Sequence, residues 1–287
     1  MLLSSCGGRK EGSANIENGE KPALITQVEY LDNMLLENSG LILYNGKLWT
    51  INDSGGDPVL FALDIQTGKV LQAVLVKNGS NRDWESLAQD ENFIYICDVG
   101  NNYGRREVLN IYKLAKDSIP SSGNTVINAE IISYSYAERE KNNPVKRSAY
   151  DCEAAFAYGD SIYLFTKDWE TRTSTLYTCS KKPGKYQLSP KRIYPVDGLI
   201  TGVDRSPDNS FIVFSGYKEY VPFIWILKDF NPVDYSHGKA LRFDYPVFID
   251  LQTEGIAVSS PERVYISCEM TEYPAALYRI DVGPYVK

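Results

Sequence analysis

The chain has 287 residues, of which 43% are hydrophobic and 12% aromatic, and its net charge is −7. This length allows one large domain or two ordinary ones, each with a substantial core. No cluster of Lys and Arg marks a nucleic-acid-binding surface, and no apolar stretch approaches the ~20 residues of a membrane-spanning helix. We therefore expect a mildly acidic protein that binds no nucleic acid.

The first residues resemble the lipobox of bacterial lipoproteins, in which a Cys that follows small residues carries the lipid. Leu3, Ser4 and Ser5 precede Cys6, and a polar stretch with the composition of a flexible tether follows. A complete signal peptide has a basic region and roughly 7–15 apolar residues before this point, so an upstream start and a chance resemblance both stay open. We predict that residues 1–22 are a flexible tether and that lipid on Cys6 anchors the protein to a membrane outside the cytoplasm, at the outer membrane or in the periplasm.

A repeated unit fills residues 23–287, which we predict to be a single domain. Each copy begins with Glu or a substitute, a small residue and an apolar residue, and continues with three strand-like segments. The openings are at Ser39, Glu85, Glu153, Thr201 and Glu254. Apart from one longer gap, their spacing is about that of a four-stranded propeller blade, roughly 40–50 residues.

The repeats predict an all-β fold, a five-bladed β-propeller closed by an N-terminal strand. The last copy has room for three strands, and residues 24–30 alternate with period two, so they are expected to supply its outer strand. In the longer gap, residues 125–136 are expected to be the fourth strand of blade two and residues 138–148 a charged lid or rim. Six blades, or two separate β domains, are the alternatives. Helices should be scarce.

The topology of a propeller gathers the acidic residues of the repeat on one face. Consecutive strands are antiparallel, so the start of the innermost strand and the end of the second strand lie together. The carboxylates placed there are those of Glu85, Glu153, Glu254, Asp53, Asp98, Asp168 and Glu269. Seven like charges repel one another in a partly desolvated pocket, and Ca2+ suits such oxygen ligands best. The alternatives are that the Glu residues brace the ring through backbone N–H groups, or that they act in catalysis.

Several residues near the ends of the second strands are candidates for ligand binding. The predicted binding face consists of Asp53, Trp84, Asp98, Asn101, Arg105, Arg106, Asp168 and Glu269. Arginines can bind anions through two parallel hydrogen bonds, and Trp can stack on a sugar ring. Ordinary turn chemistry and packing between blades are the simpler explanations of the Asn and Trp residues. A nucleophilic triad would depend on His237 alone, so no catalytic residue can be assigned.

Four cysteines besides Cys6 stand in or near apolar segments, and no CxxC pair occurs. We expect buried thiols, with a Cys97–Cys152 disulfide as the alternative.

Residues 83–88 and 94–102, followed by Arg106, resemble uncharacterised secreted β-propellers of Bacteroidetes-type bacteria. The opening at Glu254 is also similar to those of esterase-like phytase and gluconolactonase-type propellers. Gluconolactonase-like members hold a cation in the channel, which implies Glu85, Glu153 and Glu254 as its ligands here, with Asn52 or Asn101 as a possible amide ligand. The chain departs from those relatives at the two openings without Glu, and they usually have six blades.

These observations predict an extracytoplasmic propeller lipoprotein that is a cation-dependent hydrolase of a lactone, phosphoester or glycan. The alternative is a non-catalytic propeller that binds a glycan or peptide; a structural lipoprotein is a third reading. The sequence leaves open whether the protein is an enzyme at all. We expect a monomer whose only membrane contact is the lipid anchor.

Overall fold

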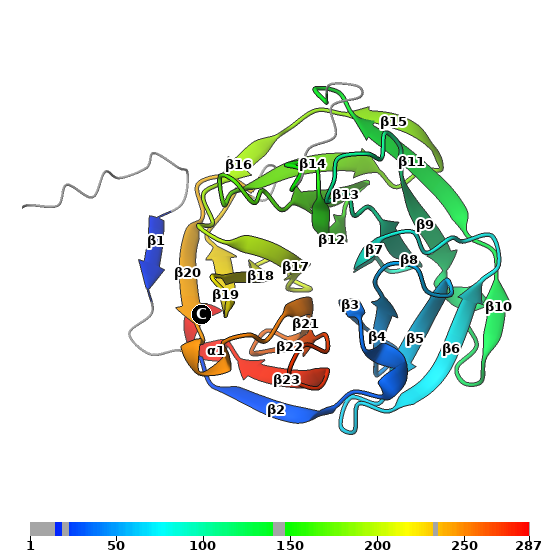
Figure 1. Cartoon of the computed structure of the whole chain (residues 1–287), viewed down its shortest axis with the longest axis horizontal. Coiled ribbons are helices and arrows are strands. Elements are labelled where there is room, and N and C mark those ends of the chain that lie inside the picture. Colours follow the sequence, from blue (N-terminus) through cyan, green and yellow to red (C-terminus); the bar gives the residue numbers. More distant parts are fainter. Residues whose placement is uncertain (1–14, 19–22, 140–146, 232–234, 287) are drawn as a thin grey trace, which may run out of the picture.

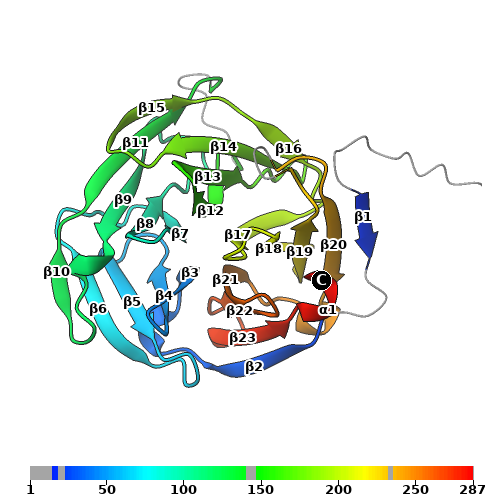
Figure 2. The same cartoon turned by 180° about the vertical axis from the view of Figure 1, so that it is seen from behind.

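The computed structural model describes residues 15–18, 23–139, 147–231 and 235–286. Cys6 and most of the predicted charged lid lie outside these residues. The described part of the chain forms a five-bladed β-propeller around a central channel (Figure 1; Figure 2 shows the other side). This confirms the predicted fold. No helix in the described ranges is long and apolar enough to cross a membrane.

Each blade is an antiparallel sheet whose first strand lines the channel. Blade 1 consists of β3 (Asn38–Tyr44), β4 (Lys47–Asn52), β5 (Val59–Leu63) and β6 (Val70–Val76). Blade 2 consists of β7 (Trp84–Gln89), β8 (Phe93–Asp98), β9 (Leu109–Ala115) and β11 (Glu130–Tyr136). Blade 3 consists of β12 (Cys152–Tyr158), β13 (Ser161–Thr166), β14 (Ser174–Ser180) and β16 (Arg192–Tyr194). Blade 4 consists of β17 (Leu199–Arg205), β18 (Phe211–Lys218), β19 (Val221–Lys228) and β20 (Lys239–Asp244).

An N-terminal strand closes the ring, as the alternating pattern predicted. Blade 5 consists of β21 (Thr253–Ser260), β22 (Arg263–Cys268), β23 (Ala276–Asp281) and β2 (Ile25–Tyr30). Strand β2 pairs antiparallel with β23, with Ile25 opposite Ile280 and Tyr30 opposite Ala276. Both ends of the domain therefore lie in one sheet, which leaves no terminal blade exposed. The described residues between the second and third openings form no sixth blade.

The prediction of one strand over residues 125–136 was wrong. Strand β10 (Thr125–Ile127) pairs parallel with β6 of blade 1, and only β11 belongs to blade 2. The Asn78 side chain separates the two strands, because it accepts a hydrogen bond from Ala129 N and donates one to Ala129 O. Two other short strands also pair parallel with an outer strand: β15 (Gly184–Leu188) with β11, and β1 (Asn15–Asn18) with β20.

Apolar side chains fill the spaces between adjacent blades. Trp49, Trp84 and Trp225 are among the largest fully buried side chains. Cys97, Cys152 and Cys179 lie in the core between blades 2 and 3, and all four described cysteines are free and buried. The Cys97–Cys152 disulfide is therefore wrong. Helical structure in the described residues is limited to three 3-10 turns and α1 (Gly283–Val286), as expected.

Candidate functional site

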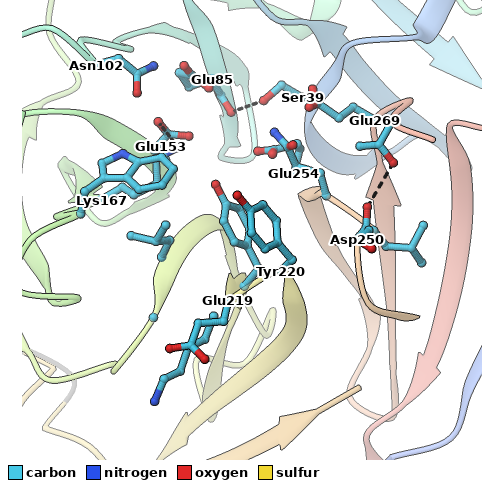
Figure 3. A pocket seen from close by; sticks show the side chains of 18 of the residues that line it. Ser39, Glu85, Asn102, Glu153, Lys167, Glu219, Tyr220, Asp250, Glu254 and Glu269 are labelled. Atoms are coloured by element: carbon cyan, nitrogen blue, oxygen red, sulfur yellow. Dashed lines mark hydrogen bonds and ion pairs between the residues drawn. The ribbon is translucent and has the colours of Figure 1, made fainter. Parts of the chain in front are cut away.

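A β-bulge at the start of each innermost strand directs side chains into the channel. The pairing register shifts at Glu85 in β7, at Glu153 in β12 and at Glu254 in β21. Strands β3 and β17 have the same irregularity at Gly40 and Thr201. A bulged residue has no partner in the ladder, and the local bend re-aims its side chain. Figure 3 shows the three Glu side chains around one cavity.

The cavity at the channel mouth has a volume of about 720 Å³. Its lining includes the carboxylates of Asp53, Glu85, Glu153, Glu254 and Glu269, the cations of Arg147, Lys167, Arg172 and Lys218, and the rings of Trp169, Tyr217 and Tyr220. The three Glu residues of the bulges are buried, with exposed fractions of 4%, 2% and 5% for Glu85, Glu153 and Glu254. The most acidic part of the lining is therefore also the least hydrated.

Five carboxylates beside the channel form two groups that share Glu85. One oxygen of each of Asp53, Asp83 and Glu85 lies within 4.8 Å of the other two, and the same holds for Glu85, Asp151 and Glu153. Gly100 makes this approach possible, because a Cβ at this position would lie 2.4 Å from Glu85 Oε1.

Asp151 is the most enclosed of these carboxylates, with no exposed surface. Its Oδ1 accepts a hydrogen bond from Asn101 N at 2.6 Å. Its Oδ2 is buried and has no hydrogen-bond partner. An unsatisfied buried carboxylate oxygen is costly, so this atom calls for a cation or a proton.

Two buried cations offset part of the acidic charge. Lys167 Nζ lies 2.7 Å from Glu153 Oε1. Arg106 Nη2 lies 2.8 Å from Asp98 Oδ1, and the same guanidinium donates to the backbone oxygens of Asp98 and Gly100. Arg106 therefore neutralises Asp98 and holds the turn after β8, and Lys167 is the buried cation inside the cavity.

Burial raises the pKa of most of these acids. Burial and the charges of Asp83 and Glu153 raise the pKa of Asp53 to about 8. Burial and Glu153 raise the pKa of Asp83 to about 6, and burial and Glu37 raise the pKa of Glu269 to about 7. The pKa values of Glu85, Asp151 and Glu254 lie well above their usual range, with burial as the main cause. Without a bound cation, several of these acids hold protons at neutral pH.

Lys167 behaves in the opposite way. Burial alone lowers the pKa of its ammonium, but the carboxylates of Glu153 and Asp151 outweigh burial and hold the pKa well above its usual range. Lys167 is therefore a permanent cation and a poor nucleophile.

The structure brings five of the predicted site residues together at the cavity: Asp53, Glu85, Glu153, Glu254 and Glu269. Six others do not line it. Trp84 has no exposed surface and lies in the core between blades 1 and 2. Asp98 and Asn101 are buried and bind Arg106. Arg105 is exposed beside the ring of Tyr103. The Asp168 carboxylate accepts hydrogen bonds from Glu170 N and Thr171 N and so caps its own turn.

The two openings without Glu have a different contact. The Ser39 hydroxyl donates to Glu85 O of the next blade, and the Thr201 hydroxyl donates to Thr253 O. These residues brace adjacent innermost strands through the backbone.

Sequence reasoning missed Asp83, Asp151 and Lys167 as members of the site. The first two carried a readable signal, because each stands two residues before a Glu opening, so that Asp-x-Glu occurs in blades 2 and 3. Lys167 is the neighbour of Asp168, the residue taken as the end of the second strand in blade 3. The predicted end of the strand was wrong by one residue, so Asp168, which belongs to a turn, was assigned to the channel in place of Lys167.

No protein-family model matches the chain, and no curated protein matches its sequence. Among solved structures, the PQQ-bound aldose sugar dehydrogenase of Streptomyces coelicolor is similar over 91% of this chain and 99% of that chain, with a TM-score of 0.50 and 10% sequence identity. A putative 6-phosphogluconolactonase from Bacteroides uniformis aligns over 85% of this chain and 67% of its own, with a TM-score of 0.44 and 12% identity. The likeness to the sugar dehydrogenase supports the propeller fold, and at 10% identity it carries no information on activity.

Proposed function

We propose that the protein is a cation-dependent hydrolase that binds a small molecule in the channel cavity. The observation that carries this proposal is the fully buried Asp151, whose Oδ2 has no partner and which shares a carboxylate group with Glu85 and Glu153. A ring that needed only bracing would not require this charge, since Ser39 and Thr201 brace the same position without it.

The residues present fit a hard divalent cation such as Ca2+. The donors are carboxylate oxygens, which Ca2+ prefers. Glu85 and Glu153 stand at bulges in paired strands, and Asp151 directly precedes β12, where its backbone oxygen accepts a hydrogen bond from Lys167 N. Glu85, Asp151 and Glu153 would hold the ion. When bound, such a cation polarises a carbonyl or phosphoryl oxygen of the substrate.

Other residues of the cavity supply binding and proton transfer. A volume of about 720 Å³ is in the range of small-molecule sites, and Trp169 and Tyr217 provide an apolar wall. Glu269 lines the same cavity and has a pKa of about 7, which suits a general base that takes a proton from the attacking water. Lactones, phosphoesters and glycosides are the substrate classes to test.

The matching experiment is a substrate screen with and without a chelator. We expect turnover that requires Ca2+, is lost in Glu153→Gln and persists in Glu91→Gln, the same change in an exposed turn between β7 and β8 on the opposite face. A turnover rate that is the same with and without the chelator contradicts the proposal. Binding of a glycan or peptide without turnover overturns it in favour of a non-catalytic binding propeller.

We also propose that the protein is anchored outside the cytoplasm. A lipid on Cys6 would hold a monomeric propeller outside the cytoplasm, at the outer membrane or in the periplasm. Metabolic labelling with a fatty acid tests this directly: incorporation that Cys6→Ser abolishes supports the anchor, and labelling that the variant retains contradicts it.

A further inference from the structure

Glu85 belongs to both carboxylate groups of the channel. On one side lie Asp151 and Glu153, which are buried, and on the other lie Asp53 and Asp83, which are partly exposed. Asp53 also lines the open cavity. The group with Asp151 is therefore the more deeply buried and the group with Asp53 the more exposed, and Glu85 belongs to both.

Each group contains its own unsatisfied oxygen. Asp151 Oδ2 is buried without a partner in the inner group, and Asp53 Oδ1 is buried without a partner in the outer group. One cation between Glu85, Asp151 and Glu153 would satisfy only the first of them. The second needs a partner of its own.

The chain backbone is adapted to both groups at once. A Cβ at Gly100 would lie 2.4 Å from Glu85 Oε1 and 2.5 Å from Asp83 Oδ2, so the absence of a side chain lets these two carboxylates lie against the same stretch of main chain. Gly100 has no positive φ that would require glycine. The close approach of the two carboxylates is the reason for glycine there.

The charges of the two groups match two ions. When all are ionised, the five carboxylates of Asp53, Asp83, Glu85, Asp151 and Glu153 have five negative charges, and the buried Lys167 offsets one of them. One divalent cation offsets two of the remaining four charges, and a second offsets the other two.

We propose that the channel binds two divalent cations that share the Glu85 carboxylate. Glu85, Asp151 and Glu153 hold the inner ion, and Asp53, Asp83 and Glu85 hold the outer ion beside the cavity. The inference rests on the cation of the proposed function and adds a second one. Paired ions bridged by a carboxylate can contact two oxygens of one substrate, which suits an ester of phosphate or a carboxylic acid.

The stoichiometry of binding tests the second ion without any substrate. Ca2+ is titrated calorimetrically into chelator-treated protein, and Mn2+ is added in parallel for electron paramagnetic resonance, in which two neighbouring Mn2+ ions give a coupled spectrum. We expect two ions per chain and a coupled Mn2+ signal. Asp53→Asn and Asp151→Asn should each bind one ion and lose the coupling, whereas Asp117→Asn, an exposed control, should keep both.

The outcomes separate the two proposals. One ion per chain, uncoupled Mn2+ and no effect of Asp53→Asn overturn the second site and leave the proposed hydrolase standing. No ion at all overturns both. Asp53 is partly exposed, so its variant is expected to fold even if Asp151→Asn does not.

Discussion

Lys167 Nζ and Glu153 Oε1 lie 2.7 Å apart, and their side chains are 8% and 2% exposed. The lysine therefore occupies one side of a carboxylate that we assign to a cation. Removing one partner of a buried pair typically costs about 3–5 kcal/mol, because the other charge stays buried and unpaired.

Lys167→Met should therefore lower the free energy of unfolding by about 3 kcal/mol in the presence of a chelator. The same variant should bind Ca2+ more tightly than the wild type, since the competing ammonium is gone. Chemical denaturation and calorimetric titration measure the two effects. Weaker Ca2+ binding in Lys167→Met would show that the lysine supports the ion site and does not compete with it.

Gly100→Ala tests whether Ca2+ binding depends on the close approach of the Glu85 and Asp83 carboxylates to the main chain. The added Cβ would lie 2.4 Å from Glu85 Oε1, so the carboxylates of Glu85 and Asp83 must move apart. We expect at least a tenfold loss in Ca2+ affinity, which corresponds to about 1.4 kcal/mol. Gly56→Ala is the matched control, because its Cβ would meet only Asn81 Nδ2 at 3.8 Å. Equal affinities in the two variants would contradict the assignment.

Tyr220 lies at the cavity mouth in a conformation that suits glycine. The turn between β18 and β19 has φ values of 51° at Glu219 and 66° at Tyr220. A turn with nearly the same backbone angles joins β3 and β4 on the opposite face, with φ values of 51° at Asn45 and 71° at Gly46. Asn-Gly is the favoured sequence for such a turn, whereas a bulky residue in the left-handed conformation costs roughly 1–2 kcal/mol.

We expect Tyr220→Gly to raise the thermal midpoint by about 3 °C and to lower kcat/KM for the substrate. The side chain is 69% exposed and lines the cavity, so a ligand contact would explain a tyrosine at this strained position. Gly46→Tyr is the reverse change on the other face, where it should lower the midpoint and leave turnover unchanged. If Tyr220→Gly stabilises the protein with no loss of turnover, Tyr220 has no part in recognition.

Asp204 gives a pH dependence that is separate from the channel. Its two oxygens accept hydrogen bonds from Arg205 N and Val258 N at 2.8 Å, and burial raises its pKa to about 7. The folded state holds this proton more tightly than the unfolded chain, so the stabilisation is present at low pH and is lost as the pH rises through about 7.

Asp204→Asn removes this titration. The free energy of unfolding of the wild type relative to the variant should therefore fall between about pH 4 and pH 7, as measured by urea denaturation. Titration of the channel acids is common to both proteins and cancels in the difference. A difference that stays constant with pH would place the pKa of Asp204 near its ordinary value.

The repeat predicted the blades, the closing strand and the inward position of Glu85, Glu153 and Glu254, because strand period and blade length follow from local sequence. Three features depended on contacts between distant segments. Strand β10 pairs with blade 1 through Asn78, Arg106 turns back to Asp98, and Trp84 packs into the core. Strand β13 ends at Thr166, and the exact end of a strand is not marked in the sequence, so Lys167 was overlooked in favour of Asp168.

We assign Glu85, Asp151 and Glu153 as ligands of one cation, and Glu85, Asp53 and Asp83 as ligands of a second. Anomalous diffraction at the manganese absorption edge from crystals soaked in Mn2+ tests this assignment. We expect anomalous density between Glu85, Asp151 and Glu153, with a second peak between Glu85, Asp53 and Asp83. An anomalous map without density in the channel, with Lys167 still paired to Glu153, would contradict it.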